Sequence, residues 1–419
     1  MPAPVLGRVI LVNQYYPPDE AATAQLLGDL GSALAASGFA VRTICGDRGY
    51  ADPSKRYPAR ATIDAVAVER VRSTSFGRTS KLGRVLDYGT FLIGAAFRLL
   101  VGPRPDVVIS LTTPPLIALV GSCMARIRGA RSIFWSMDVY PDVAYELGAL
   151  RRTSFAGRFF GWLSRRMLRS ADIVVALGET MRERLIASGA ERVKIIPNWS
   201  PDFGSDDEPA AANRLRREWG WEGRFVVMYS GNLGLAHEFN TLLQAALSFS
   251  ERNSRVLFAF VGSGPRLDEV KLAARELALK NVEFRSPVPR EMLGETLRAA
   301  DVHVVTLRDR MPGLLVPSKI YGILSAARPA IYVGPDQGEL WDIVREGACG
   351  SCAQIGDVAR LVQIIEDYLQ SVERTRQQGA RAREMYLQRF TPAKSIAMFV
   401  DLLAHKAVDH NQVSQHRKG

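Results

Sequence analysis

Two glycine-rich segments in the second half of the chain have the composition of a phosphate-binding site. They are SGNLG at 230–234 and GSGPR at 262–266, and each stands just before a segment with a helical pattern. Glycines allow backbone amides to approach an anion closely, and the start of a helix favours negative charge. A glycine that merely ends a strand is the alternative. The candidate binding residues in these segments are Gly231, Asn232, Gly262, Ser263 and Gly264.

Two further segments, VPSK at 316–319 and GPDQGE at 334–339, add side chains of matching chemistry. The first places a hydroxyl and an ammonium at an expected helix start, where charge and helix dipole both favour phosphate. The second supplies a carboxylate that can accept hydrogen bonds from sugar or ribose hydroxyls. A solvated lysine and an ordinary first-turn acid are the alternatives. The candidates here are Pro317, Ser318, Lys319, Gly338 and Glu339.

In the first half, candidate catalytic chemistry rests on carboxylates, because all histidines come after residue 200. Asp138 follows an apolar run at 132–137 and is followed by Tyr140. A carboxylate at the end of a buried strand suits an acid, a base or a group that orients an acceptor, with turn or helix capping as the alternative. Asp19 and Glu20 are candidates to hold acceptor hydroxyls, and capping has equal weight for them.

Short β-branched runs alternate with helical patterns and so predict the elements that position these residues. This alternation indicates parallel sheets covered by helices, an α/β protein with two doubly wound, Rossmann-like domains. Ligands bind beyond the carboxyl ends of such strands, so two domains facing each other would enclose a cleft. The expected strands are 8–13, 40–45, 65–71, 106–111, 132–137, 172–177 and 194–198, then 225–232, 256–264, 282–287, 301–307 and 330–335. The expected helices are 20–37, 84–100, 114–128, 155–169, 238–250, 266–279, 318–327, 357–371 and 373–389.

The break in this alternation sets the expected domain boundaries. The acidic, Ala-rich stretch 201–213 (PDFGSDDEPAAAN) is predicted to be a linker. It separates an N-terminal domain over 1–200 from a C-terminal domain over 214–390. We expect a final helix over 391–405 that crosses back to the first domain, and a polar tail over 406–419.

The charge of the chain is unevenly distributed. The 419 residues carry a net charge of +11, and their 47% hydrophobic content excludes a disordered or collagen-like protein. Residues 1–200 hold 26 Lys and Arg against 16 Asp and Glu, whereas the rest hold 28 against 27. No aromatic-interleaved basic patch or reading helix favours a nucleic-acid partner. The positive first half therefore indicates a different anionic partner, and a membrane surface is one candidate.

The segment 151–169 (RRTSFAGRFFGWLSRRMLR) predicts a basic amphipathic helix. Such a helix can lie in an anionic membrane interface. Packing on the sheet is the better explanation of its apolar face alone, but it does not explain the positive charge of this half. The longest apolar stretch, 89–102, is interrupted by Arg98 and is shorter than the ~20 residues that span a bilayer. No signal-peptide pattern opens the chain. These features predict a cytoplasmic protein that is peripheral to a membrane.

Five segments in this order resemble the retaining glycosyltransferases of family 4, which have the GT-B fold. They are NQYYPPDE and the following helix at 13–41, SADIVVALGETMRERLIASGAERVKIIPNWS at 170–200, FVVMYSGNLG and its helix at 225–246, FVGSGPRLDEV at 260–270, and the PSKIYG-containing run at 316–350. The most similar sub-group builds bacterial surface polysaccharides, such as O-antigen, capsule or exopolysaccharide, on polyprenyl-diphosphate carriers. The YPPD-type and PSKIYG segments carry that likeness.

The resemblance implies a specific reaction. A sugar, an N-acetylated or deoxy hexose, would pass with retention of configuration from a nucleotide-diphosphate donor to a lipid-linked acceptor at the cytoplasmic face of the inner membrane. UDP is the nucleotide expected for this sub-group. No metal and no cofactor is implied, and no DxD-like acidic pair ends a strand. Lys319 and Asp138 would be the catalytic residues, and Asp19, Glu20 and Tyr140 would face the acceptor.

The chain departs from the family pattern at several positions. Ala21-Ala22 replace its usual Gly-Gly, Asn232 and His237 stand where Arg and Lys clamp the diphosphate, and Leu314 and Gly322 replace its paired glutamates. The resemblance then implies that Lys319 takes the diphosphate charge with support from Arg308 or Arg310, and that Glu339 replaces a lost carboxylate. A catalytically decayed or regulatory protein and a nucleotide-sugar 2-epimerase remain the alternatives.

Overall fold

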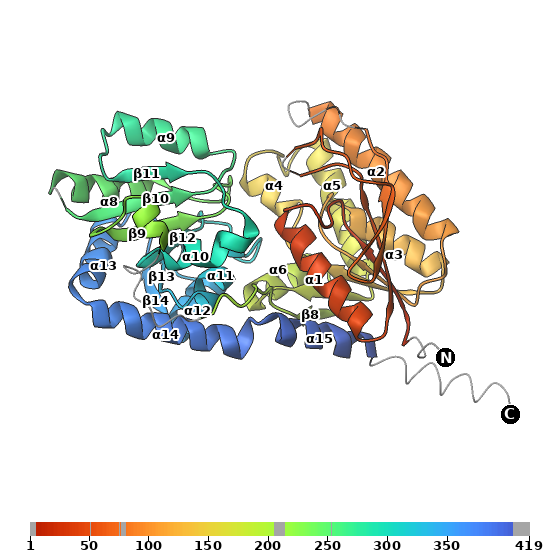
Figure 1. Cartoon of the computed structure of the whole chain (residues 1–419). Helices are drawn as coiled ribbons and strands as arrows, with labels where there is room; N and C mark the ends of the chain where they lie inside the picture. Colours follow the sequence, from red (N-terminus) through yellow and green to blue (C-terminus); the bar gives the residue numbers. More distant parts are fainter. Residues whose placement is uncertain are drawn as a thin grey trace. The chain divides into compact units, whose positions relative to one another are not determined.

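The computed structural model describes residues 6–50, 52–74, 76, 81–204, 214–252 and 254–404. The chain divides into two compact units (Figure 1). The first comprises residues 1–197 together with the chain from 393 onward, and the second comprises 198–392. Each unit is built on its own predominantly parallel sheet.

The sheet of the first unit has eight strands among the described residues, in the order β3-β4-β2-β1-β5-β6-β7-β8. Neighbouring strands are parallel except for the antiparallel pair β3 and β4 at one edge. All four residues of the central strand β5 are buried, as expected where helices cover both faces of a sheet. The strands are β1 (Arg8–Val12), β2 (Ala40–Gly46), β3 (Arg60–Ile63), β4 (Val66–Val71), β5 (Val107–Ser110), β6 (Arg131–Trp135), β7 (Ile173–Ala176) and β8 (Val193–Ile195).

Helix α3 contacts both α2 and α5 and packs on β5 and β6. It begins three residues later than the predicted start at 114, because Leu116 is left-handed with φ of 72°. A left-handed residue cannot continue a right-handed helix. The helices up to residue 197 are α1 (Ala22–Ala36), α2 (Lys81–Val101), α3 (Ile117–Ile127), α4 (Asp142–Glu146), α5 (Phe155–Ser170) and α6 (Glu179–Ala187).

The last described helix, α15 (Pro392–Ala404), is part of the first unit from residue 393 onward. The ring of Phe399 lies 4.7 Å from that of Trp135, measured between centroids, and both side chains are fully buried. The Arg131 guanidinium also donates a hydrogen bond to the backbone oxygen of Leu402. The polar tail expected over 406–419 lies outside the described residues.

The sheet of the second unit has six parallel strands among the described residues, in the order β11-β10-β9-β12-β13-β14. Every residue of β9, β10, β12 and β13 is buried, so these strands form the centre of the core. The strands are β9 (Phe225–Ser230), β10 (Val256–Val261), β11 (Val282–Arg285), β12 (Val302–Thr306), β13 (Ala330–Val333) and β14 (Gly350–Ala353).

The predicted linker over 201–213 is wrong for its first four residues, because they are attached to the second unit. The Phe203 amide donates to Ser325 Oγ at 2.9 Å, and Arg383 pairs with Asp202 at 2.7 Å. Residues 205–213 lie outside the described part of the chain. The helical segments of this unit are α7 (Arg214–Glu218), α8 (Asn240–Glu251), α9 (Leu267–Glu276), η2 (Arg290–Met292), α10 (Leu293–Arg298), α11 (Lys319–Ser325), α12 (Glu339–Glu346), α13 (Val358–Gln370) and α14 (Val372–Arg389).

Candidate active site

The strand order of the second unit locates its candidate ligand site. Strands β9 and β12 are neighbours, and from this pair the order runs outward in opposite directions. Such a reversal point, at the carboxyl ends of the strands, is where open α/β sheets bind ligands. The loop 230–234 follows β9, and the segment 307–318 between β12 and α11 ends immediately before Lys319. The sequence-predicted phosphate segments therefore meet at this position.

The two glycine-rich loops are joined by backbone hydrogen bonds. The Gly231 amide donates to the Val261 oxygen at 2.8 Å, and the Leu233 amide donates to the Ser263 oxygen at 2.8 Å. These bonds hold the loop after β9 against the loop after β10. The two predicted segments thus form one continuous surface at the strand ends.

Close packing of these loops requires glycine at two positions. A Cβ atom on Gly262 would lie 2.1 Å from the Gly231 backbone oxygen, and one on Gly264 would lie 2.6 Å from Asn232 Oδ1. Both residues also have positive φ, 150° and 148°. A larger residue at either position would force the loops apart.

The amides of the loop glycines differ in what they can bind. Those of Gly231 and Gly262 already donate to protein carbonyls. The prediction that Gly231 and Gly262 bind an anion through their amides is therefore wrong for these two residues. The backbone N–H groups of Asn232, Ser263 and Gly264 have no acceptor among the described residues. These three are therefore the amides that a bound anion can use.

Lys319, the first residue of α11, supplies a positive charge beside the first glycine loop. Its Nζ lies 3.4 Å from the centroid of the Tyr229 ring. It also lies 4.0 Å from the position that a Cβ atom on Gly231 would occupy. This Nζ is buried and has no hydrogen-bond partner among the described residues. Burial holds the pKa of the ammonium well below its usual 10.5. An ammonium without a partner is costly to bury, and an anionic ligand would remove that cost.

His237 does not supply a second charge. Its Nδ1 lies 2.6 Å from the backbone oxygen of Thr306, which fixes the ring. Burial, and then the nearby Lys319, lower the pKa of His237 to about 3, so the imidazole is neutral at physiological pH. Asn232 is uncharged as well. The two positions where the family carries Arg and Lys are thus both neutral in this chain, and Lys319 stands closest to the glycine loop.

The two positions of the lost family glutamates are closely packed. Leu314 is buried, and a Cβ on Gly322 would lie 3.3 Å from Leu297 Cδ1, 3.6 Å from Ser200 Oγ and 3.7 Å from the Phe203 ring. A longer side chain at position 322 would therefore require these neighbours to move.

Glu339 is half-buried in the first turn of α12 and lines a small depression together with Leu315, Val316 and Tyr332. Gly338, which precedes it, has φ of 93°, and a Cβ there would lie 2.8 Å from the Pro312 side chain. The Tyr332 hydroxyl is buried without a hydrogen-bond partner among the described residues. Sequence reasoning missed Tyr332, although its position near the end of a short buried strand is a usable signal.

The remaining donor-side candidates are Pro317, Ser318, Arg308 and Arg310. The Ser318 side chain is exposed and does not cap α11, and Pro317 beside it is buried. Arg308 and Arg310 are exposed, and the Arg308 guanidinium lies 3.3 Å from the Leu235 backbone oxygen. The Arg308 bond places its guanidinium next to the residue that follows the first glycine loop.

In the first unit, three loops at the carboxyl ends of β1, β5 and β6 are held together. The Gln14 amide donates to the Thr113 oxygen, and the Met137 amide donates to Thr112 Oγ1, both at 2.8 Å. The order of strands reverses between β1 and β5, so these loops mark the second reversal point. Asp138 and Tyr140 belong to this cluster.

Asp138 lies just beyond β6, and no described group donates a hydrogen bond to its carboxylate. Burial raises its pKa to about 6 from the usual 3.8. Helix α4 begins with Pro141 as its N-cap residue and has no side-chain cap, so the capping alternative for Asp138 is wrong. A carboxylate with a raised pKa at a strand end is a candidate acid or base.

Asp19 has a structural position. Its two carboxylate oxygens accept hydrogen bonds from the backbone amides of Ala21 at 2.9 Å and Tyr50 at 2.6 Å, and the residue is buried. This geometry matches the capping alternative, since both oxygens are already used. Glu20 is exposed. Tyr140 is half-buried, and burial raises the pKa of its hydroxyl, with Asp138 as the next cause.

Helix α5 presents aromatic side chains to solvent. Phe155, Phe159 and Trp162 are 86%, 47% and 47% exposed, whereas Met167 and Leu168 face the core. The alternative that the whole apolar face packs on the sheet is therefore wrong for these three aromatic residues. The arginines of the segment, at 151, 152, 158, 165, 166 and 169, are all exposed beside them. The result is a surface that is both aromatic and positively charged.

Two further observations concern what the structure could accommodate. Within the described ranges, no group of three or more His, Cys, Asp or Glu side chains is placed to hold a metal ion. None of the helices in those ranges is both long and apolar enough to cross a membrane.

Comparison with known families identifies both halves of the chain. Residues 22–199 match the model of the glycosyl transferase 4-like domain, and residues 212–385 match that of glycosyl transferases group 1. The chain belongs to the family 4-type glycosyltransferases. It is therefore an enzyme of sugar transfer.

Two curated relatives of this chain are named as glycosyltransferases, one of them in colanic acid biosynthesis. WbjE of Pseudomonas aeruginosa, named as a glycosyltransferase, is 28% identical over 302 residues, which cover 70% of this chain and 74% of WbjE. WcaI of Escherichia coli K12, named for colanic acid biosynthesis, is 25% identical over 356 residues, or 80% of this chain and 84% of WcaI.

Solved structures confirm the predicted GT-B architecture of two parallel-sheet α/β domains. HepE from Anabaena, crystallised with UDP, has a TM-score of 0.71 at 15% identity and covers 95% of this chain and 100% of its own. WaaG, a glycosyltransferase of lipopolysaccharide biosynthesis, has a TM-score of 0.67 at 17% identity, covering 93% and 99%. At these identities the likeness concerns the fold.

Proposed function

We propose that this glycosyltransferase moves an N-acetylated or deoxy hexose, with retention of configuration, from a UDP-linked donor to an acceptor carried on polyprenyl diphosphate. Lys319 is the observation that carries the proposal, because its buried ammonium has no hydrogen-bond partner among the described residues and stands beside a glycine loop. The name of WcaI, which refers to colanic acid biosynthesis, supports a role in surface polysaccharide synthesis. The UDP bound in HepE supports the choice of nucleotide.

The donor half of the reaction follows from the charge on the leaving group. As the glycosidic bond of the donor breaks, negative charge builds on the departing nucleoside diphosphate. Lys319 and the amides of Asn232, Ser263 and Gly264 would stabilise that charge. Because these groups are fixed before the reaction, they lower the energy of the transition state more than that of the bound donor. No metal ion or cofactor is part of the proposal.

The acceptor half rests on Asp138. Above its raised pKa of about 6 the carboxylate is ionised, so it can accept a hydrogen bond from the attacking hydroxyl and orient it. Tyr140 on the same loop would contact the acceptor, and Asp19 would hold the loop rather than the substrate. Glu20, which is exposed, remains a candidate contact.

Helix α5 would bring the enzyme to the cytoplasmic face of the inner membrane. Its exposed aromatic side chains can enter the interface, and each nearby arginine contributes about 1 kcal/mol near an anionic surface. The excess of positive charge over residues 1–200 has the same sign and lies in the same unit. A lipid-linked acceptor resides in that membrane, so docking there would supply the substrate.

The test is transfer itself. Purified enzyme is incubated with bacterial membranes and a panel of radiolabelled nucleotide sugars, with and without EDTA, and the extracted lipids are counted. We expect label in lipid from one UDP-sugar, unchanged by EDTA. No transfer from any donor would favour a decayed or regulatory protein. Conversion of the free nucleotide sugar to its 2-epimer would favour an epimerase.

A further inference from the structure

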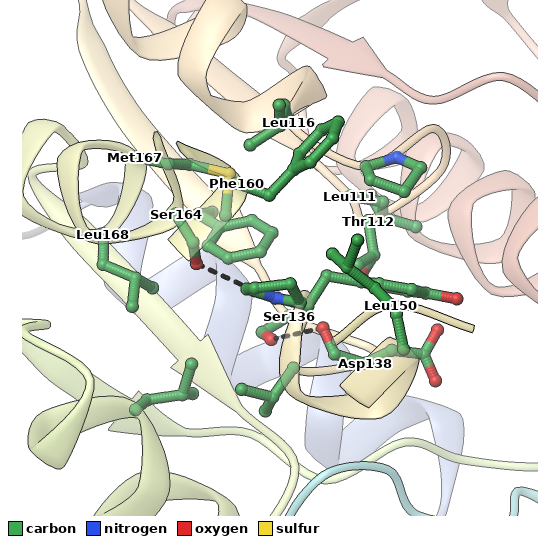
Figure 2. A pocket seen from close by; sticks show the side chains of 17 residues that line it. Leu111, Thr112, Leu116, Ser136, Asp138, Leu150, Phe160, Ser164, Met167 and Leu168 are labelled. Carbon is green, nitrogen blue, oxygen red and sulfur yellow. Dashed lines mark hydrogen bonds between the residues drawn. The ribbon is translucent and has the colours of Figure 1, made fainter. Parts of the chain in front are cut away.

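The first unit contains a cavity of about 170 Å³ beside the end of β6. Its walls are supplied by α4, α5 and α6, by the end of β6 with the loop after it, and by the loop that precedes α3. Figure 2 shows the lining side chains. The surface that faces the cavity is mostly apolar, with Leu116, Leu150, Phe160 and Met167 among its side chains. The polar residues that line it are Thr112, Ser136, Asp138, Tyr140 and Ser164. None of the described residues that line it is a lysine, arginine or histidine.

The size and lining of the cavity suit a hydrocarbon. An apolar cavity of about 150 Å³ stays dry and takes up benzene, so a larger one of the same kind can hold one or two isoprene units. Because the lining has no cation, nothing in the cavity would compensate the charge of a phosphate. Its occupant is therefore apolar.

Phe160 connects the cavity to the exposed face of α5. It lines the cavity, is itself 37% exposed, and its ring lies 6.1 Å from that of exposed Phe159. On the other side, Asp138 and Tyr140 are also lining residues. A chain that enters past Phe160 thus runs from an aromatic, positively charged surface toward the strand end that carries a carboxylate.

We propose that this cavity binds the isoprene units at the head of the acceptor's lipid chain, which enter it past Phe160. The assignment to the acceptor rests on the proposed function, because Asp138 and Tyr140, its acceptor-side residues, share the cavity wall. The cavity selects the lipid, whereas the phosphate and sugar of the acceptor stay outside it. Chain recognition therefore belongs to the first unit alone.

Ala144 on α4 offers a way to fill the cavity without touching a proposed catalytic residue. The variants are Ala144→Phe and the smaller Ala144→Leu, in case the larger one fails to fold. Ala36→Phe is the matched control, because Ala36 is exposed at the end of α1. Folding of each variant is checked by circular dichroism and thermal unfolding.

The probe is tritiated geraniol, a branched ten-carbon isoprenoid alcohol, and binding to the full chain is measured by equilibrium dialysis without vesicles. We expect saturable one-to-one binding that Ala36→Phe leaves unchanged and Ala144→Phe weakens at least tenfold. Absence of saturable binding would overturn the proposal. So would binding that neither substitution of Ala144 weakens in a folded chain.

Unlabelled 1-decanol, a straight chain of equal carbon number, distinguishes an isoprenoid from an ordinary acyl chain. We expect it to compete at least threefold less well than geraniol, because the double bonds and branches of the isoprenoid leave less conformational freedom to lose. Equal or better competition by decanol would overturn the assignment to the acceptor chain and favour a bilayer lipid.

The dialysis experiment needs neither donor nor sugar transfer, so its result is separate from that of the transfer assay. If geraniol fails to bind while labelled sugar still reaches lipid, the cavity assignment fails alone. If geraniol binds but no donor yields labelled lipid, the proposed transfer fails while the lipid site stands.

Discussion

The two units bury groups of opposite charge in contrasting surroundings. In the second unit, the Lys319 ammonium lies over the Tyr229 ring and has no hydrogen-bond partner among the described residues. In the first unit, Asp138 lies in a mostly apolar cavity wall to which no described lysine, arginine or histidine contributes. Burial lowers the pKa of the first and raises that of the second, so both are pushed toward neutrality.

This contrast indicates which substrate each unit would bind in the proposed reaction. In the proposed reaction, the diphosphate of the donor would supply the anion that binds the Lys319 ammonium. The lipid-linked acceptor would supply a hydroxyl to the Asp138 carboxylate and a hydrocarbon to the apolar wall around it. Each unit thus lacks what one substrate brings, and removing either group should affect only one side of the reaction.

Lys319→Met gives the largest expected effect. It removes the positive charge next to the leaving diphosphate, so kcat/KM for sugar transfer should fall by about 10²–10³-fold, as when a fixed transition-state donor is lost. The unliganded chain should become more stable, because a buried group without a partner is replaced by an apolar one. Transfer rates and thermal unfolding measure the two effects.

Lys280→Met is the control for Lys319, because Lys280 is exposed in the same unit. This substitution should leave the rate of sugar transfer unchanged. It should also leave unchanged the increase in Tm that saturating UDP produces, because UDP binds the native state. Lys319→Met should lose most of that increase. A variant at 319 that keeps both activity and the UDP-induced shift would remove the contrast between the units.

Asp138→Asn tests the acceptor side and should lower kcat/KM by about 10²-fold, the lower range for loss of a positioned acid or base. In the unmodified enzyme, kcat/KM should fall tenfold per pH unit below about 6, because protonation removes the carboxylate. UDP binding should be unaffected by the substitution. If the variant instead loses UDP binding and keeps its response to acceptor, the assignment of the two units is reversed.

The same variant should show a stability effect of defined sign. The folded-state pKa of Asp138 is raised, so its ionised form destabilises the fold: the cost is absent below pH 3.8 and complete above about pH 6. Asparagine removes this destabilising ionisation. The free energy of unfolding should therefore rise by about 1–3 kcal/mol at pH 8, and by about half as much at pH 5. Urea unfolding at both pH values measures this.

Trp162→Ser gives the smallest expected effect, since it concerns attachment rather than chemistry. Partitioning onto anionic vesicles should fall by about tenfold, because the side chain no longer buries apolar area in the interface. Raising the salt concentration from 0.1 to 1 M should weaken binding further, by screening the arginines. Leu272→Ser on α9, which removes an equally exposed apolar side chain from the second unit, should have no effect.

The sequence predicted the regular parts of the fold because buried parallel strands are short apolar runs. β9, β10 and β12 lie inside the expected ranges for this reason. The edge strand β3, with alternating exposed and half-buried residues, was not predicted. Short helices such as α4 and α10 were also missed, since five or six residues give too little periodicity to detect.

The candidate sites were predicted in part. Chemistry at strand ends pointed to Lys319 and Asp138, because ionisable groups after apolar runs are visible in sequence. The use of Asp19 as a hydrogen-bond acceptor for a distant loop was not visible, since Tyr50 is far along the chain. Likewise, nothing in the spacing showed that Tyr229 lies under the Lys319 ammonium. Such contacts depend on tertiary packing.

The position of α15 has a consequence for how the chain is made. The hydrophobic partner of Trp135, Phe399, is separated from it by the entire second unit in sequence. During synthesis from the N-terminus, the first unit therefore leaves the ribosome with part of its core uncovered and waits for the last helix. The first unit thus begins to fold first but is completed last. A ribosome stall or nonsense codon near the end of the chain should therefore damage the first unit before the second.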